Sequence, residues 1–270
     1  MPDTTLENIR RFSDDQYSTE HRLNARIRIY DYCERNDNLQ RWIFEKLDFT
    51  GVKDVLDLGC GNGLLWKRNA LLIPEGIRIT LSDISEGMVS AARESLRESG
   101  QFRYQVADAC HTPFEDSTFQ IILANHMLYH IEDKDLVFAE INRLLTDDGC
   151  AYASTLTIYN FLELFRLADD FDRRLSFEAD DIVSNFSLEN GEDILSVNCN
   201  VIEKCIYEND VVTADAESLI LYLALCYTPE QLEVLIDRYN DFKAFISSNV
   251  GKTGQLRMTN KAVLFKFRKK

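Results

Sequence analysis

The chain has 270 residues, and its excess of acidic side chains gives a formal net charge of −15. A nucleic-acid backbone is bound by stripes of lysine and arginine, so this balance argues against DNA or RNA as a partner. Seven cysteines without a Cys-x-x-Cys pair indicate reduced thiols rather than a disulfide framework. No apolar run reaches the ~18 residues of a membrane-spanning helix, and no signal peptide is recognisable. We therefore expect a cytoplasmic protein that binds neither nucleic acid nor membrane.

The first elements in the chain are a helical segment, a short strand and a glycine-rich turn. Residues 1–50 are polar, with apolar side chains at helical spacing. Val55–Leu58 form an apolar run that predicts a buried strand, and glycines follow at alternate positions, namely Gly59, Gly61 and Gly63. Glycine accepts positive φ and lets a ligand approach bare backbone, and the helix that follows offers unpaired N–H groups. This turn is therefore expected to hold a nucleotide-like ligand.

The glycine spacing bears on which nucleotide is bound. The dinucleotide fingerprint G-x-G-x-x-G needs its third glycine where this chain has Leu64, because the helix packs closely on the strand there. The spacing thus disfavours an NAD-dependent oxidoreductase. A variant of the dinucleotide-binding turn stays open as an alternative.

The second strand is predicted over Arg78–Ser82 and ends at Asp83. An acid at this strand end, about twenty residues beyond the glycines, can accept hydrogen bonds from both ribose hydroxyls of a nucleotide. The alternative is that Asp83 only caps the next helix.

Two further strands end in polar residues. Arg103–Val106 is followed by Asp108, and Phe119–Ala124 is followed by Asn125 and His126. Open α/β sheets bind ligands beyond the carboxyl ends of their strands, so we expect these side chains to line the site.

A metal site is not expected. His126 and His130 lie four residues apart, as zinc-binding pairs on helices do, but Met127 stands where the metalloprotease motif has glutamate. No third ligand is apparent in the sequence.

These elements together resemble the class I S-adenosylmethionine-dependent methyltransferases. The similarity rests on the D-x-G-x-G-x-G turn of Asp57–Gly63, on Asp83 and Asp108, and on the pattern P-F-x-D-x-x-F-x-x-I of Pro113–Ile122. That pattern is typical of the small-molecule branch, methyltransferase type 11, which includes the ubiquinone/menaquinone-biosynthesis enzymes. The resemblance covers residues 52–156 well. It implies a Rossmann-like seven-stranded sheet with helices on both faces, an antiparallel last strand and helical cap insertions.

The resemblance also implies a reaction and a set of site residues. The expected reaction is methyl transfer from S-adenosyl-L-methionine to a small-molecule acceptor (EC 2.1.1.-), leaving S-adenosyl-L-homocysteine. His126 is the candidate general base, and Tyr17, His130 and Tyr159 are candidates for acceptor binding. The residues expected to bind the cofactor are Asp57, Gly59, Cys60, Gly61, Asp83, Ile84, Met88, Asp108, Ala109 and Asn125.

The remainder of the chain is expected to complete one domain. Leu136–Leu145 and the stretch from Thr228 to about Ile246 predict helices; the latter opens with a capping box and proline at the first helical place. Cys150–Leu156 predicts the fifth strand. The expected division of residues 1–270 is an N-terminal cap 1–50, a cofactor-binding core 51–156, helical insertions 157–194 and 210–250, and closing strands 195–209 and 255–268.

Two other classes of function remain as alternatives to a methyltransferase. One is the NAD-dependent oxidoreductase, and the other is a non-catalytic module that binds the cofactor and acts through a partner. A protein or RNA methyltransferase is a third possibility, for which the sequence shows no docking surface. We expect a monomer or a homodimer.

Overall fold

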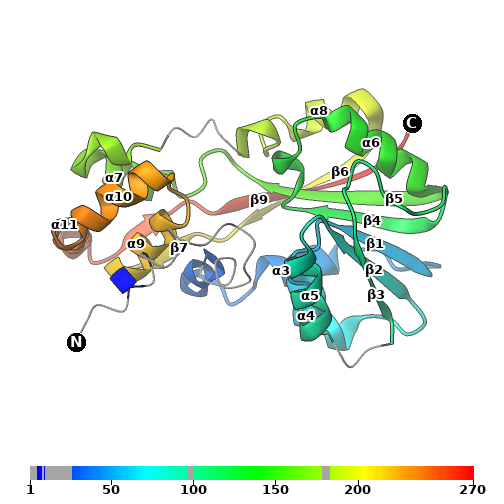
Figure 1. Cartoon of the computed structure of the whole chain (residues 1–270), viewed down its shortest axis with the longest axis horizontal. Helices are drawn as coiled ribbons and strands as arrows, with labels where there is room; N and C mark the ends of the chain where they lie inside the picture. Colours follow the sequence, from blue (N-terminus) through cyan, green and yellow to red (C-terminus); the bar gives the residue numbers. More distant parts are fainter. Residues whose placement is uncertain (1–4, 8, 10–25, 97–99, 178–182) are drawn as a thin grey trace. The chain divides into compact units, whose positions relative to one another are not determined.

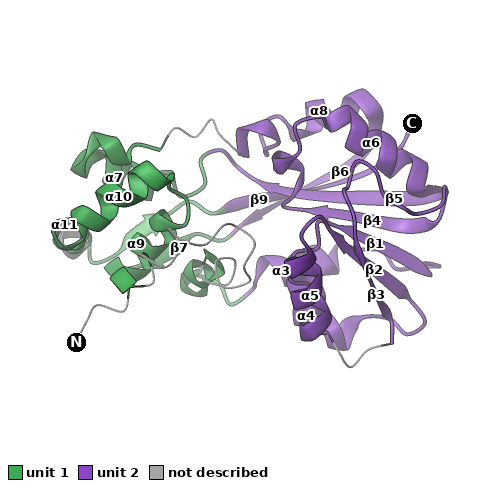
Figure 2. Ribbon diagram, in the orientation of Figure 1, with its two compact units in different colours: residues 1–36, 159–178, 209–260 green, residues 37–158, 179–208, 261–270 purple. Residues whose placement is uncertain are grey.

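The structure is a computed structural model, and it describes residues 5–7, 9, 26–96, 100–177 and 183–270. The chain divides into two compact units, which Figure 2 distinguishes by colour. Unit 1 consists of Met1–Asn36, Tyr159–Glu178 and Asn209–Asn260, and unit 2 of Asp37–Ile158, Ala179–Glu208 and Lys261–Lys270. The prediction that 1–270 is a single domain stays a prediction.

Unit 2 is built on a seven-stranded sheet in the order β3-β2-β1-β4-β5-β9-β6 (Figure 1). The first five strands in this order are parallel to one another, and β9 runs antiparallel to both β5 and β6. The predicted sheet with its antiparallel last strand is therefore confirmed. The strands are β1 Asp54–Leu58, β2 Arg78–Asp83, β3 Phe102–Val106, β4 Phe119–Asn125, β5 Leu145–Leu156, β6 Cys199–Glu208 and β9 Lys261–Lys269.

Helices cover both faces of this sheet, as predicted. Successive strand residues point to opposite faces, so Val55 and Ile121 pack with α3, α4 and α5, whereas Leu56 and Ile122 pack with α6 and α8. Both faces are buried, which is why these strands are nearly continuous apolar runs. The helices are α3 Leu39–Glu45, α4 Leu64–Asn69, α5 Glu86–Ser95, α6 Lys134–Leu144 and α8 Gly191–Asn198.

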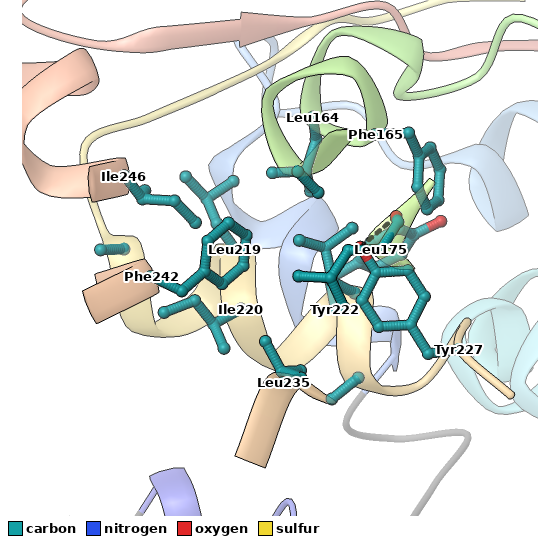
Figure 3. Close-up of a cluster of buried hydrophobic side chains, with 14 of the residues drawn as sticks. Leu164, Phe165, Leu175, Leu219, Ile220, Tyr222, Tyr227, Leu235, Phe242 and Ile246 are labelled. Atoms are coloured by element: carbon teal, nitrogen blue, oxygen red, sulfur yellow. Dashed lines mark hydrogen bonds between the residues drawn. The ribbon is translucent and has the colours of Figure 1, made fainter. Parts of the chain in front are cut away.

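Unit 1 is mainly helical and has its own apolar core. Figure 3 shows Leu164 of α7, Leu219 of α9, Leu235 of α10 and Phe242 of α11 in one buried cluster. A two-stranded antiparallel sheet of β7 and β8 belongs to the same unit. The elements are α7 Leu162–Phe171, β7 Val211–Thr213, α9 Ala216–Ala224, α10 Pro229–Asp237, α11 Tyr239–Thr253 and β8 Leu256–Met258.

The predicted closing strands differ from the observed ones at their starts. Residues 195–198 end helix α8, so the strand begins at Cys199 and not at Leu195. Leu195 lies in α8 and is fully buried against the sheet. Packing of this helix on the sheet outweighs the strand preference of the local sequence. Similarly, residues 256–258 form β8 with β7, and the closing strand starts at Lys261.

Three helix and strand boundaries also differ. The expected helix from Thr228 to Ile246 is two helices, α10 and α11, with Arg238 between them. Its start is as predicted, because Thr228 and Gln231 form the capping box. Residues 211–213, placed in a helical insertion, form β7, and the fifth strand starts at Leu145, earlier than expected. Over the described ranges, no helix has the length and apolar character needed to cross a membrane.

Candidate functional site

The carboxyl ends of three adjacent parallel strands meet at the glycine-rich turn. Leu58, the last residue of β1, lies opposite Ser82 of β2 and Ala124 of β4. The residues that follow these three in the chain are therefore level with one another at the edge of the sheet. They are Gly59, Asp83 and Asn125.

The turn depends on glycine at defined places. Gly59, Gly61 and Gly63 have φ of 65°, 54° and 72°, a region that residues with a Cβ rarely adopt. A Cβ on Gly59 would lie 2.8 Å from the Cβ of Met127, so this position also requires glycine for close approach. The turn thus presents bare backbone at the strand ends.

Asp83 is oriented by two backbone donors. Its Oδ2 accepts a hydrogen bond from the Gly61 N–H at 3.0 Å, and its Oδ1 accepts one from the Ser85 N–H at 2.9 Å. Helix α5 is capped by Ser85, whose Oγ accepts from the Met88 N–H, so Asp83 is not the helix cap. Each carboxylate oxygen has a second lone pair for a ligand hydroxyl.

Asp57 lies buried beneath the turn. It is 2% exposed, and its Oδ2 accepts a hydrogen bond from Trp66 Nε1 at 2.8 Å. Its Oδ1 is also buried and has no hydrogen-bond partner in the described part of the chain. Burial raises the pKa of Asp57 to about 7, the Trp66 bond acts in the opposite direction, and the charge of Asp83 adds to the rise. Burial also raises the pKa of the Cys60 thiol well above its usual value, so the thiol is neutral.

The segment after β3 is hydrogen-bonded to helix α6. Asp108 is exposed, and its Oδ1 accepts a hydrogen bond from the Cys110 N–H at 2.9 Å. Thr112 donates through its N–H and Oγ1 to Glu140 at 2.8 and 2.6 Å. Burial alone would raise the pKa of Glu140, but the bonds from Arg143 and Thr112 lower it to about 2. Sequence reasoning missed Glu140, although an acid between the apolar residues of a helix was a visible signal.

The end of β4 combines an amide that lacks a full set of partners with a strained histidine. Asn125 Oδ1 accepts from Ser154 Oγ at 3.1 Å, whereas its Nδ2 is buried and has no partner among the described residues. His126 has φ of 52°, an unusual conformation for a residue with a side chain. Such strain is concentrated at functional sites.

The other predicted site residues differ in their exposure and in the unit to which they belong. Ile84 is 73% exposed, and Met88 and Ala109 are half-buried. His130 is exposed at the end of a short 3-10 helix, with its ring against that of Tyr129. Tyr159 belongs to unit 1, and the other described site residues belong to unit 2. Tyr17 lies outside the described residues. No cluster of three or more potential metal ligands occurs within the described ranges.

Comparison with known proteins finds similarity over the part of the chain that carries this site. Residues 56–153 match the family model described as a methyltransferase domain. The malonyl-[acyl-carrier protein] O-methyltransferase of Legionella pneumophila is 32% identical over 45% of this chain and 43% of its own length. The ubiquinone/menaquinone biosynthesis C-methyltransferase UbiE of Vibrio vulnificus is 29% identical over 53% of this chain and 58% of its own length. The chain thus spans about half the length of the curated relatives it matches.

Solved structures share the fold at low sequence identity. A candidate methyltransferase from Bacillus halodurans superposes with a TM-score of 0.58 at 15% identity, covering 85% of this chain and 98% of that protein. The [4+2]-cyclase SpnF superposes with a TM-score of 0.52 at 19% identity, covering 86% and 80%. Residues 56–153 thus match the model of a methyltransferase domain, and unit 2 has the sheet and glycine-rich turn expected for that fold.

Proposed function

We propose that this protein is an S-adenosylmethionine-dependent methyltransferase that acts on a small-molecule acceptor. The proposal rests on polar groups at adjacent strand ends that can still form hydrogen bonds to a ligand. Asp83 is fixed with free lone pairs, while Asp57 Oδ1 and Asn125 Nδ2 are buried without partners among the described residues. Buried polar groups are normally paired, so these two atoms indicate a site that a polar ligand completes.

The donors and acceptors at this site fit S-adenosylmethionine. When bound, the cofactor supplies a methyl group on a positively charged sulfur. Asp83 would accept from the ribose hydroxyls, and Asp108 from the adenine amino group. Asp57 Oδ1 would accept from a cationic group of the ligand, and Asn125 Nδ2 would donate to an acceptor atom. The bare backbone of Gly59–Gly63 allows the ligand to approach closely.

For methyl transfer by in-line displacement, the protein must mainly align the nucleophile, the methyl carbon and the sulfur. Proximity and orientation can supply about 7–11 kcal/mol, which makes a dedicated catalytic group optional. His126, at the end of β4, is the proposed base for a hydroxyl or carbon-acid acceptor. Excluding water from the strand ends would protect the activated methyl group.

The acceptor is proposed to be a small molecule. The names of the relatives include both O- and C-methyltransferases, so the acceptor atom is open. The family model ends at residue 153 and does not include the insertion 157–194, in which the acceptor-binding candidate Tyr159 lies. The net charge of −15 further disfavours a nucleic-acid acceptor.

Two rival functions make distinct predictions. An NAD-dependent oxidoreductase of one class would carry a Tyr-x-x-x-Lys pair, and Tyr239 and Lys243 have this spacing. However, Tyr239 is buried in unit 1 and Lys243 pairs with Glu217, which disfavours a catalytic role for the pair. The likeness to SpnF, a [4+2]-cyclase, shows only that this fold also occurs in a protein named for a different reaction. A non-catalytic module would bind the cofactor and transfer nothing.

The deciding experiment is calorimetric titration of the protein with S-adenosylmethionine, S-adenosylhomocysteine and NAD in parallel. We expect the first two to bind and NAD to give no heat. Incubation with methyl-labelled cofactor and a fractionated metabolite extract should then label a small molecule. Binding of NAD alone would overturn the proposal, and cofactor binding without any labelled product would favour the non-catalytic module.

A further inference from the structure

Trp66 occupies an unusually constrained position beside the cofactor site. It lies in the first turn of α4, directly after the glycine turn, and it is fully buried. The edges of two aromatic rings enclose it: Phe44 at 6.2 Å between centroids and 88°, and Phe102 at 6.4 Å and 66°. These contacts come from α3 and β3, so the indole is held from two elements and has little freedom to turn.

The indole meets the most deeply buried acid of the site. Its N–H donates to Asp57 Oδ2 at 2.8 Å, and this is the hydrogen bond that the described structure shows for the Asp57 side chain. An indole N–H is a donor only, so it cannot exchange roles or take the proton. The bond therefore fixes the plane of the carboxyl group and leaves Oδ1 as the oxygen available to a ligand.

We propose that Trp66 is a positioning residue for the cofactor: its indole N–H fixes the Asp57 carboxylate so that Oδ1 is presented to a cationic group of the ligand. The inference rests on the proposed function and deepens it. A cation at Oδ1 would pair a buried carboxylate that one neutral donor cannot fully stabilise. The tryptophan thus acts on the ligand through Asp57 and not by contact.

This arrangement couples cofactor binding to the ionisation of Asp57. Burial raises the pKa of Asp57 to about 7, and the Trp66 bond lowers it. The titratable groups acting with it are Asp83, whose charge raises the pKa, and Cys60, whose thiol is neutral. Near pH 7 part of the free protein carries a protonated Asp57, and a cationic ligand selects the ionised form. Binding should therefore release a proton and strengthen as the pH rises through about 7.

The test is the pH profile of S-adenosylmethionine affinity between pH 6 and 8.5, measured by calorimetry. For the unaltered protein we expect about a tenfold gain in affinity from pH 6 to 8. Trp66→Phe should bind most weakly at low pH, recover towards pH 8.5, and shift the midpoint upward. Trp42 is a half-buried tryptophan of α3 whose ring packs against that of Tyr207 at a tilt of 54°. Trp42→Phe is therefore the matched control and should leave the profile unchanged. Asp57→Asn should retain only the titration of the ligand itself.

The result against the proposal is equally defined. A Trp66→Phe profile with the same midpoint, whether unchanged or uniformly weaker at every pH, would show that Trp66 serves packing alone. If Trp66→Phe does not fold, Trp42→Phe leaves Trp66 as the sole tryptophan, because the chain has two tryptophans, and its emission is read with excitation that tyrosine does not absorb. Its emission should then titrate with a midpoint near pH 7, and adding Asp57→Asn should abolish that titration. A flat emission profile overturns the coupling.

The fluorescence test also separates this inference from the proposed function. If the unaltered protein binds no S-adenosylmethionine at any pH, the proposed function fails. The emission of Trp66 still reports whether the indole and Asp57 are coupled, because it needs no ligand.

Discussion

The pKa values of two carboxylates in unit 1 are lowered by their hydrogen-bond partners, whereas that of Asp57 at the strand ends of unit 2 is raised by burial. In unit 1, Asp172 accepts hydrogen bonds from Arg174 and Arg238, and these bonds hold its pKa well below the usual range. Asp215 accepts from Tyr32 and Ser218, which outweigh the effect of burial and lower its pKa. These acids stabilise the folded chain.

At the glycine turn of unit 2 the pattern is reversed. Asp57 is more deeply buried than Asp172 but has one neutral donor, and its pKa rises to about 7. Asn125 Nδ2 is unpaired within the described structure, and His126 has a strained backbone. Asp172 and Asp215 of unit 1 are thus paired within the folded chain, whereas Asp57 and Asn125 at the strand ends of unit 2 each keep a buried polar atom without a partner among the described residues, as the proposed ligand site requires.

The largest expected effect is on catalysis at His126. His126→Ala should lower turnover by about 10²–10⁴-fold if His126 is the base, while the affinity for S-adenosylmethionine and the unfolding free energy change little. His126→Asn should behave similarly, because asparagine tolerates positive φ but cannot take the proton. Steady-state kinetics and calorimetry measure the two quantities. A loss of affinity with normal turnover would make His126 a binding residue.

Gly59→Ala tests the strain at the turn itself. The left-handed conformation costs about 1–2 kcal/mol for alanine, and the contact with Met127 should add about 1–3 kcal/mol of overpacking. Gly51→Ala is the control, since Gly51 has φ of 73° and open space around it, and only the first cost should apply. Urea unfolding measures both. Equal losses at the two glycines would contradict the close approach.

The two acids Asp57 and Asp172 should respond with opposite signs to replacement by asparagine. The folded-state pKa of Asp57, about 7, exceeds the unfolded value of ~3.9. The native state therefore binds more protons than the unfolded state between these values, and the free energy of unfolding falls as the pH rises from about 4 to 7. Asp57→Asn should therefore stabilise the ligand-free protein above pH 7 by about 2–4 kcal/mol, and the gain should vanish near pH 4.

Asp172→Asn should do the reverse. Its folded-state pKa is depressed, so its stabilisation is present above the unfolded pKa and lost as the pH falls. We expect a loss of about 1–3 kcal/mol at neutral pH, shrinking below pH 4. Unfolding curves at several pH values measure both variants. The same sign for both would break the comparison between the units.

An effect as small as that of Asp172→Asn is expected for Asp83. Asp83→Ala should weaken S-adenosylmethionine binding by about 1–3 kcal/mol, the usual cost of a charge-assisted hydrogen bond. Asp54→Ala is the control, because Asp54 pairs with Arg78 at the opposite end of the same strands and should leave affinity unchanged. Unaltered affinity in a folded Asp83→Ala protein would refute the ribose assignment.

Local patterns in the sequence determined the fold of the sheet. Buried parallel strands are largely apolar runs, and Val55–Leu58 and Phe119–Ala124 carry that signal without help from distant residues. Arg78–Ser82 alternates apolar and polar residues, which is also typical of a strand. Glycine spacing and the capping box at Thr228 are likewise properties of a few consecutive residues. Because open α/β sheets place ligands at strand ends, these strands also indicated Asp83 and Asn125.

Tertiary structure decided what depends on partners far apart in the chain. The helix over 195–198 and the pairing of β7 with β8 follow from packing against distant elements, which overrides local preference. No local sequence signal predicts the bond between Trp66 and Asp57 or the left-handed backbone of His126. The same holds for Asp57 Oδ1, which lacks a partner among the described residues. They arise because the folded sheet removes water from these groups and leaves each with only the neighbours that the fold provides.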